Sequence, residues 1–452
     1  MNWRYVHLFI GLFFLIISLF FQQEVFNYTA IGVTTIMVYW WITQPIPLYL
    51  TALIPIVIGV PLNLITYESL AEAYGNKMVF LFFGGFVIAL AIEKWHLHRF
   101  FAEKILVLFG NSPKQLLAGF MVSTAFLSMW ISNTATALMI LPMALSVIQS
   151  IPRFRLKKKF AIALLLGVAF AANIGGTATL VGTPPNVQMA GILSQYFDIE
   201  VNFIHWFKIG FPFMLILLSA TYFVLRWIFL KNIYFELPQF NHTSLNTNQL
   251  RVLIIFITVV IFWISGTYMN KLIPISLNDT STALMGAMLM FIIPAKSGKP
   301  LLVWGDMNKL PWGILFLFGG GLALANILSN TGVLNHFVLL LSELNFVPYF
   351  LLLLLIFTVT IFATELMSNL ALVSLMIPVM AQFAVVSGNP VFHISAGIAL
   401  CSSCAFMLPV ATPPNAIIYS SNLLKVKTMA KVGIILNLLT ILLVTCMFWV
   451  LE

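Results

Sequence analysis

Charged side chains are scarce in this sequence. Asp, Glu, Lys and Arg supply 8% of its 452 residues, whereas hydrophobic residues supply 61%. Soluble domains carry about one quarter charged residues, so a water-soluble fold of this size would lack the polar residues needed to cover its surface. The composition therefore excludes an ordinary soluble protein and indicates a membrane protein.

Cysteine is also scarce, with three residues in the whole chain. Cys401, Cys404 and Cys446 all fall inside apolar runs, so they do not form a disulfide framework. The spacing of Cys401 and Cys404 would allow a metal or redox pair. Small residues that pack a membrane helix are the better interpretation.

Long apolar runs are what the sequence has in abundance. Runs of about 17 to 25 residues recur from end to end, and each is long enough to cross a ~30 Å hydrocarbon layer as a helix. The first run, 3–21, is too long for a signal peptide and lacks a small-x-small cleavage motif, so we read it as a retained span. We predict an all-α polytopic membrane protein with about 11 transmembrane helices, starting near residues 5, 27, 46, 78, 158, 204, 250, 280, 312, 393 and 429.

The formal net charge of +9 does not indicate nucleic-acid binding, because the basic residues mark one side of the predicted membrane topology. The loop 153–159 contains five basic residues and the loop 198–200 contains none. Only Lys77, Lys208 and Lys271 fall on the other side. The positive-inside rule therefore predicts a multi-pass protein of the cell inner membrane, with a cytoplasmic amino terminus and an external carboxyl terminus.

Four apolar regions are interrupted by small polar residues or prolines. In 114–150 and 346–388 the interruption lies in the middle, which predicts two re-entrant hairpins. Regions 158–196 and 393–422 read as broken helices. We expect the first break from Asn173 to Asn186 and the second from Pro409 to Asn415. Non-helical backbone at membrane depth is tolerated where it lines a polar cavity or is buried in protein.

These interruptions recur at a nearly constant interval. Phe83-Gly-Gly85 matches Phe318-Gly-Gly320, Ser132-Asn133 matches Ser368-Asn369, and Thr183-Pro-Pro-Asn186 matches Thr412-Pro-Pro-Asn415, at intervals of 235, 236 and 229 residues. The chain therefore reads as a duplicated unit, 1–230 and 251–452, joined by a cytoplasmic linker, 231–250. An odd number of crossings separates matching points, so one unit is inverted relative to the other, as in secondary transporters.

The hairpin tips and helix breaks expose backbone groups that suit ions. A half-helix amino terminus presents free N–H groups and suits a carboxylate, whereas a carboxyl terminus presents free carbonyls and suits a cation. Sodium prefers neutral oxygens such as amide, hydroxyl and backbone groups. The tips and breaks expected to face one another contribute Ser128, Ser132, Asn133, Thr134, Gly182 and Thr183 in the first unit, and Thr364, Ser368, Asn369, Ala411 and Thr412 in the second.

Two Ser-Asn tips, each followed by Thr-Pro-Pro-Asn, make the whole chain resemble the divalent-anion:sodium symporter family, that of the INDY dicarboxylate transporters. The resemblance implies a homodimer in which scaffold domains hold mobile transport domains that move like elevators. It implies sodium-coupled symport of small carboxylate anions, with C4-dicarboxylates such as succinate or malate as first choice.

The resemblance also implies ligand sets. The first sodium site would use Ser128, Ser132, Asn133 and Gly182, and the second Thr364, Met367, Asn369 and Ala411. The substrate would meet Ser132, Asn133, Thr134, Thr183, Pro184, Ser368, Asn369, Leu370, Thr412 and Pro413.

Two positions in the second hairpin stand out. Leu370 occupies the place where the family's second signature often has threonine, so a hydroxyl is missing there. Glu365 is an acid well inside an apolar hairpin, and Met129 stands at its counterpart. Intramembrane acids are candidates for function. Glu365 either packs the hairpin as a structural residue or supports the second cation site or protons by its charge.

Other classes of function fit the sequence less well. A membrane hydrolase with Ser132 or Ser368 as nucleophile needs a nearby base, and all seven histidines lie in predicted loops or near membrane edges. Broken helices also line ion channels, but two matching tips favour a closed site at the midplane. Within transporters, a sodium-independent dicarboxylate exchanger, or a symporter of another anion such as citrate or sulfate, remains the alternative.

Overall fold

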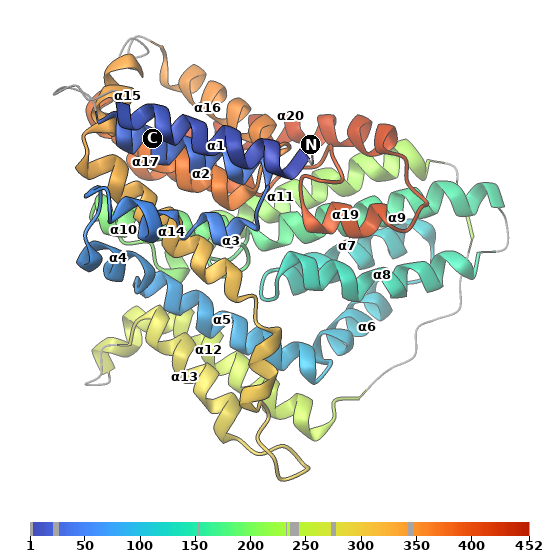
Figure 1. Cartoon of the computed structure of the whole chain (residues 1–452). Helices are drawn as coiled ribbons and strands as arrows, with labels where there is room; N and C mark the ends of the chain where they lie inside the picture. Colours follow the sequence, from blue (N-terminus) through green and yellow to red (C-terminus); the bar gives the residue numbers. More distant parts are fainter. Residues whose placement is uncertain are drawn as a thin grey trace.

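A computed structural model of the chain describes residues 3–20, 27–151, 154–231, 233–235, 244–272, 277–341 and 347–451. Throughout these residues the regular elements are helices, apart from an isolated bridge between Pro294 and Pro300. Within the part of the chain that the structure describes, eight helices are long and apolar enough to cross a membrane, by length and composition. The chain is therefore an all-helical polytopic membrane protein (Figure 1).

The first half of the chain contains α1 (Trp3–Phe20), α2 (Tyr28–Thr43), α3 (Leu48–Thr51), η1 (Pro55–Gly59), α4 (Tyr67–Tyr74), α5 (Lys77–Lys94), α6 (Leu97–Phe109), α7 (Pro113–Ser128), α8 (Asn133–Gln149), α9 (Phe154–Gly176), α10 (Pro184–Tyr196) and α11 (Phe203–Phe229). The second half contains α12 (Thr247–Leu272), α13 (Asp279–Ile292), η2 (Trp304–Lys309), α14 (Trp312–Asn330), α15 (Val333–Leu341), α16 (Tyr349–Thr364), α17 (Asn369–Ser387), α18 (Val391–Ser402), α19 (Pro413–Tyr419) and α20 (Val426–Val450).

A helix begins within four residues of each of the eleven span starts expected from the sequence. The number of long apolar helices is smaller because several of these helices are short. The expected span near residue 46 is divided into α3 and η1, and α18 has only 12 residues. Proline at Pro55 cannot donate a helical hydrogen bond, which accounts for the division near that residue.

The paired arms α7–α8 and α16–α17 occupy the regions where re-entrant hairpins are predicted. Each pair is joined by a four-residue connection, 129–132 and 365–368. Ser112 caps α7 through a capping box with Gln115, and Ser132 accepts a hydrogen bond from the backbone N–H of Ala135 at the start of α8. The first connection is therefore followed by a capped helix, whereas Ser368 makes no side-chain cap at the start of α17.

Both helix breaks differ in extent from the expected ones. The first break covers 177–183 because α9 continues to Gly176, and its Asn173 side chain turns to another segment instead of interrupting the backbone. The second break covers 403–412 and begins before Pro409. The reason is that Glu365 accepts the backbone N–H groups of 406–408, which leaves them unavailable to a helix. Pro184 and Pro413 begin the next helices at positions where a missing N–H has no cost.

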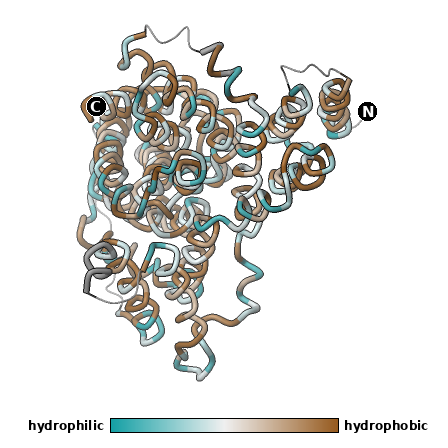
Figure 2. Tube along the Cα trace, turned by 90° about the vertical axis from the view of Figure 1, so that its left-hand side faces the viewer, coloured by the Kyte–Doolittle hydropathy of each residue, from teal (hydrophilic) through white to brown (hydrophobic). Residues whose placement is uncertain are grey.

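Segments far apart in sequence pack together in the core. Helix α9 packs against α7, α8 and α19 (Figure 1). Helix α10 packs against α17 and α18. Helix α5 packs against α13, and α14 packs against α17. The hairpins and broken helices of the two halves are thus interleaved. In Figure 2 most of the helical tube is coloured as hydrophobic, in keeping with the composition.

Several shorter elements were not expected from the sequence. Helices α4, α6 and α15 lie in stretches that the span pattern left without structure. In the predicted linker 231–250, helix α12 already begins at Thr247, and residues 232 and 236–243 lie outside the described residues.

Candidate functional site

At the first hairpin tip, oxygen atoms outnumber the protons available to them. Ser128 Oγ lies 2.7 Å from Asn133 Oδ1 and 2.6 Å from the carbonyl oxygen of Ala172. A hydroxyl has a single proton and can donate to only one of these acceptors at a time. Ser128 is fully buried, so water does not supply another donor from outside. A cation bound between these oxygens would interact favourably with the oxygen that receives no proton.

The second tip repeats this arrangement with different residues. Thr364 Oγ1 lies 2.9 Å from Asn369 Oδ1 and 2.7 Å from the carbonyl oxygen of Ser402. Thr364 is also fully buried. Thr364 corresponds to Ser128, and the carbonyl of Ser402 corresponds to that of Ala172. At both tips a hydroxyl lies within hydrogen-bond distance of an amide oxygen and a carbonyl oxygen. Two separate clusters of neutral oxygens therefore exist, one at each tip.

Glycines bring the first break close to the first tip. A Cβ atom added to Gly176 would lie 2.5 Å from Asn133 Oδ1 and 3.1 Å from the carbonyl oxygen of Gly182. A Cβ atom on Gly182 would lie 2.5 Å from the carbonyl oxygen of Gly176 and 3.0 Å from that of Met129. Because no side chain occupies this space, the carbonyl of Gly182 and the amide of Asn133 converge. The residues present therefore fit a small cation such as sodium.

A cavity of about 720 Å³ lies between the two tips and the two breaks. All ten residues expected to contact the substrate line it: Ser132, Asn133, Thr134, Thr183, Pro184, Ser368, Asn369, Leu370, Thr412 and Pro413. Gly182, Met367 and Ala411 from the expected cation sets also line it, whereas Ser128 and Thr364 do not. The two buried hydroxyls lie behind the amides of Asn133 and Asn369.

The electrostatics of this cavity come from helix ends. None of the residues that line it is an acid, a base or a histidine. Four helices begin at its wall, namely α8, α17, α10 and α19, with their first residues or N-caps among the lining residues. Helix amino termini carry partial positive charge and bind anions without a formal cation. At α8 and α17 free N–H groups accompany this charge, whereas α10 and α19 begin with two prolines and have no N–H at their first two positions. The cavity therefore suits a small anion held by neutral donors.

The opposite wall of the cavity is mostly apolar. It is formed by residues of α2, α3, α5 and α14, among them Leu48, Phe82, Phe86 and Leu317. Gln44, which caps α2 in a left-handed conformation, is the polar residue on this wall. Sequence reasoning missed Gln44, because an isolated glutamine after a helix resembles an ordinary cap.

Asn173 is a second residue that sequence reasoning did not assign to the site. It lines the cavity from α9, and its Nδ2 donates to Thr412 Oγ1 at 3.0 Å and lies 3.4 Å from Asn415 Oδ1. Asn173 therefore links the first half of the chain to the Thr-Pro-Pro-Asn segment of the second. Its place before two glycines marked it as the start of a break, and nothing in the sequence gave it a partner in the other half.

The asparagines of the two Thr-Pro-Pro-Asn motifs hold the breaks in shape. Asn186 Nδ2 donates to the carbonyl oxygen of Thr179 at 2.8 Å. Asn415 Nδ2 lies 3.0 Å from the carbonyl oxygen of Ala405 and 3.1 Å from that of Leu408. Both side chains are fully buried. The conformation of each break is thus fixed by an amide of the helix that follows it.

Glu365 lies outside the cavity and anchors the second tip. Its carboxylate accepts hydrogen bonds from the backbone N–H groups of Phe406, Met407 and Leu408 at 2.8, 2.8 and 3.0 Å, and from Asn437 Nδ2 at 2.9 Å. All four of these groups are hydrogen-bond donors, so the oxygens of Glu365 act as acceptors toward each of them. These contacts give Glu365 a structural role between the second tip, the second break and α20. Support of a cation by its charge stays a prediction.

Known proteins are similar to this chain in sequence or in fold. The family model described as CitMHS, citrate transporter, matches residues 38–397. The sodium-dependent dicarboxylate transporter SdcS from Staphylococcus aureus strains USA300 and NCTC 8325 is 35% identical over 458 residues, which cover 96% of this chain and 88% of that protein. The crystal structure of the Alcanivorax borkumensis YdaH transporter has a TM-score of 0.54 at 13% identity, over 83% of this chain and 85% of that chain, and shows similarity of fold alone.

An all-helical membrane protein whose broken helices converge on one uncharged cavity falls in the class of secondary transporters. Because the family model and the SdcS relatives match most of its length, the chain belongs to the divalent-anion:sodium symporter family. These relatives are transporters and not enzymes, which removes the hydrolase alternative.

Proposed function

We propose that this protein is a sodium-coupled symporter of small carboxylate anions, with C4-dicarboxylates such as succinate or malate as substrates. The observation that carries the proposal is the pairing of two proton-poor oxygen clusters with one uncharged cavity lined by helix amino termini. The clusters suit sodium, and the helix ends suit carboxylates. The name of the SdcS relatives, a sodium-dependent dicarboxylate transporter, supports both parts.

In this proposal the two ion types depend on each other. Sodium at the first site draws the oxygens of Ser128, Asn133 and Gly182 together, and sodium at the second does so for Thr364, Asn369 and Ala411. The amide nitrogen of each asparagine and the N–H groups of α8 and α17 then face the cavity and donate to the substrate carboxylates. Without sodium, each hydroxyl can donate to only one of its two acceptors, so the tips are less well ordered for the anion.

Alternating access would follow an elevator mechanism in a homodimer of the cell inner membrane, with the amino terminus in the cytoplasm and the carboxyl terminus outside. The hairpins and broken helices would form the transport domain. The remaining long helices would form the scaffold, and its apolar wall of Leu48, Phe82 and Leu317 would close one side of the cavity. An apolar wall makes no strong bonds with the substrate, so the transport domain can carry the substrate past it.

An imposed sodium gradient tests the proposal. Purified protein is reconstituted in liposomes that contain no internal anion, and uptake of labelled succinate is measured with and without an inward sodium gradient. We expect uptake only with the gradient. Uptake that needs an internal dicarboxylate and ignores sodium would identify an exchanger instead.

A second candidate is the same symport with citrate or another anion such as sulfate, and the description of the matching family model as a citrate transporter favours citrate. Competition of labelled succinate uptake by malate, citrate and sulfate, each with sodium present, separates these substrates.

A further inference from the structure

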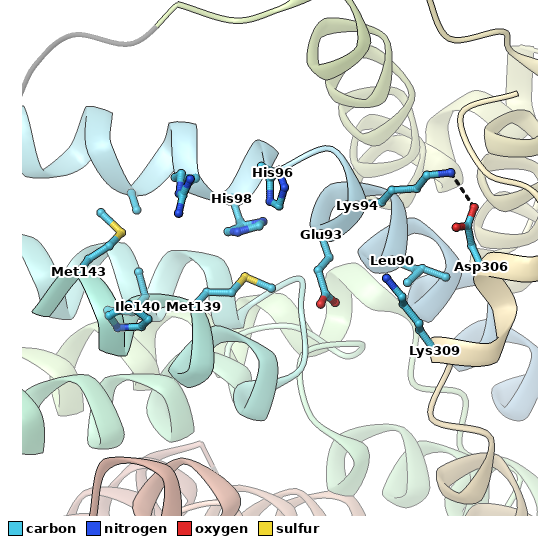
Figure 3. Close-up of a pocket in the computed structure, with 13 residues that line it drawn as sticks. Leu90, Glu93, Lys94, His96, His98, Met139, Ile140, Met143, Asp306 and Lys309 are labelled. Carbon is cyan, nitrogen blue, oxygen red and sulfur yellow. Dashed lines mark hydrogen bonds and ion pairs between the residues drawn. The ribbon is translucent and has the colours of Figure 1, made fainter. Parts of the chain in front are cut away.

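A second cavity of about 420 Å³ lies where α5 ends and α6 begins, and no residue that lines it also lines the larger cavity. Its walls come from the α5–α6 corner, from η2 and from the hairpin arm α8 (Figure 3). The sequence places its three basic residues, Lys94, Arg99 and Lys309, on the predicted cytoplasmic side.

Two of these walls are fixed to each other. Lys94 Nζ forms an ion pair with Asp306 Oδ2 at 2.7 Å, and Trp95 Nε1 donates to the carbonyl oxygen of Leu301 at 3.0 Å. Figure 3 shows the Lys94–Asp306 pair at one side of the cavity. The α5–α6 corner and η2 are therefore held together. The charges of Lys94 and Asp306 cancel, so this ion pair adds no net charge to the cavity.

The other charged groups of the cavity have no ion pair among the described residues. They are Arg99, Lys309 and Glu93, and all three side chains are exposed. In Figure 3 Glu93 and Lys309 extend into the same space. Their sum is one positive charge, so a ligand with one negative charge would balance the cavity. The carboxylate of Glu93 accepts hydrogen bonds, so the ligand should also carry a hydrogen-bond donor.

His98 adds a second acceptor. It is 7% exposed, and its Nδ1 lies 3.4 Å from the carbonyl oxygen of Ile92. Burial, partly offset by this hydrogen bond, lowers the pKa of His98 to about 4, so the imidazole is neutral at neutral pH. When Nδ1 carries the proton toward Ile92, Nε2 is left as an acceptor.

The remaining wall is apolar and belongs to the first hairpin. Met139, Ile140 and Met143 of α8 lie across the cavity from His98 (Figure 3). The cavity thus combines two unpaired cations, two acceptors and an apolar wall that suits hydrocarbon.

We propose that this cavity binds a glycerophospholipid whose head group donates hydrogen bonds. Its phosphodiester would lie between Arg99 and Lys309, its head-group hydroxyls or ammonium would donate to Glu93, and its glycerol and first acyl carbons would contact Met139 and Met143. Basic pockets between helices at the cytoplasmic membrane surface commonly hold lipid phosphates. The ligand needs both a phosphate and a head group with hydrogen-bond donors. A quaternary ammonium has no N–H group, so a lipid with that head group should bind more weakly.

Native mass spectrometry of the detergent-solubilised protein tests this site. The protein is incubated with equal amounts of phosphatidylglycerol, phosphatidylethanolamine and phosphatidylcholine, and the retained lipids are counted. We expect phosphatidylglycerol to be retained most, because it has both the negative charge and the donors, phosphatidylethanolamine next, because it has donors alone, and phosphatidylcholine least. The Arg99→Gln/Lys309→Gln variant should bind phosphatidylglycerol more weakly, by about fivefold for each lost cation.

Lys104→Gln is the matched control, because Lys104 lies on the same helix over the ring of Phe100 and does not line the cavity. It should retain lipid like the unaltered protein. If the double variant is unstable, Lys309→Gln alone, at an exposed position of η2, should still show the fivefold loss. Equal retention of the three lipids, or undiminished retention by either variant, would overturn the site. Displacement of phosphatidylglycerol by equimolar glycerol 3-phosphate would overturn the lipid in favour of a soluble phosphate.

Discussion

Asn133 and Asn369 each place a side-chain oxygen beside a buried hydroxyl that already has a second acceptor. We expect Asn133→Ala and Asn369→Ala each to raise the sodium concentration needed for half-maximal transport, by roughly ten- to a hundredfold, because a charge-assisted contact of roughly 1.5 to 3 kcal/mol is lost. Sodium titration of succinate uptake measures the change. Asn330→Ala, at an exposed residue outside the cavity, is the control. Two variants that fold and respond normally to sodium would place the cation sites elsewhere.

Leu370 makes the two tips unequal. It is 4% exposed and lines the cavity at the position that matches Thr134 in the first half. A missing hydrogen bond to a carboxylate corresponds to roughly ten- to a hundredfold in affinity when the group stays dry. We therefore expect Leu370→Thr to tighten the affinity for succinate more than for monocarboxylates, and Thr134→Leu to weaken both. Competition on the purified variants measures this preference, and an unchanged preference with lower stability would mean that Leu370 only packs the hairpin.

Among single residues, the sequence predicted those with a repeated motif. The Ser-Asn and Thr-Pro-Pro-Asn pairs were recognised because polar residues and prolines are costly in an apolar membrane segment unless they line a cavity or are buried in protein. Each motif also occurs twice at a nearly constant interval, which indicates a shared role in the two halves. Asn173 and Gln44 had no such copy. Their roles depend on which segments pack together around the cavity. This packing involves both halves of the chain and cannot be predicted from the local sequence.

At the scale of elements, the two breaks look alike and are held differently. Asn186 Oδ1 is buried without a hydrogen-bond partner, whereas Asn415 Oδ1 accepts from Asn173 at 3.4 Å. The substitution of Asn415 therefore takes one hydrogen-bond acceptor away from the buried amide of Asn173. The substitution of Asn186 removes an acceptor that had no partner, which offsets part of the loss of stability. We expect Asn415→Ala to destabilise the protein more than Asn186→Ala, by on the order of 1 kcal/mol. Thermal unfolding in detergent compares the two, and equal or reversed losses would contradict this account of the breaks.

Sequence patterns predicted hairpin arms and broken helices well because prolines and small polar residues act locally on the backbone. They gave the wrong limits for the second break, since the acceptor that captures its N–H groups, Glu365, lies about forty residues earlier. They missed α6 and α15 because short helices with a polar face do not resemble a span. Long-range hydrogen bonds and surface helices both depend on neighbours that a window of sequence does not contain.

At the scale of the whole molecule, the elevator proposal requires α5 and the first break to slide past each other. They meet at Gly85 and Val181, where a Cβ atom added to Gly85 would lie 3.7 Å from the Cβ of Val181. That separation matches the Cβ–Cβ distance of a disulfide, about 3.5 to 4.5 Å. A cysteine pair at these positions should therefore form a disulfide and hold the two parts together.

The test uses a Cys446→Ser background, because Cys446 is exposed while Cys401 and Cys404 are fully buried. We expect the Gly85→Cys/Val181→Cys variant to lose succinate transport on oxidation and to regain it on reduction.

The matched control is Gly286→Cys/Val259→Cys, which joins α13 to α12 within the proposed scaffold at the same added-Cβ to Cβ distance of 3.7 Å. Two helices that stay together during transport can be joined without cost, so oxidation of this pair should leave transport unchanged. Mass analysis of the oxidised proteins would establish that both disulfides form. Full transport by the oxidised Gly85–Val181 variant would mean that α5 and the first break move as one body, and the elevator with this division of scaffold and transport domain would then be wrong.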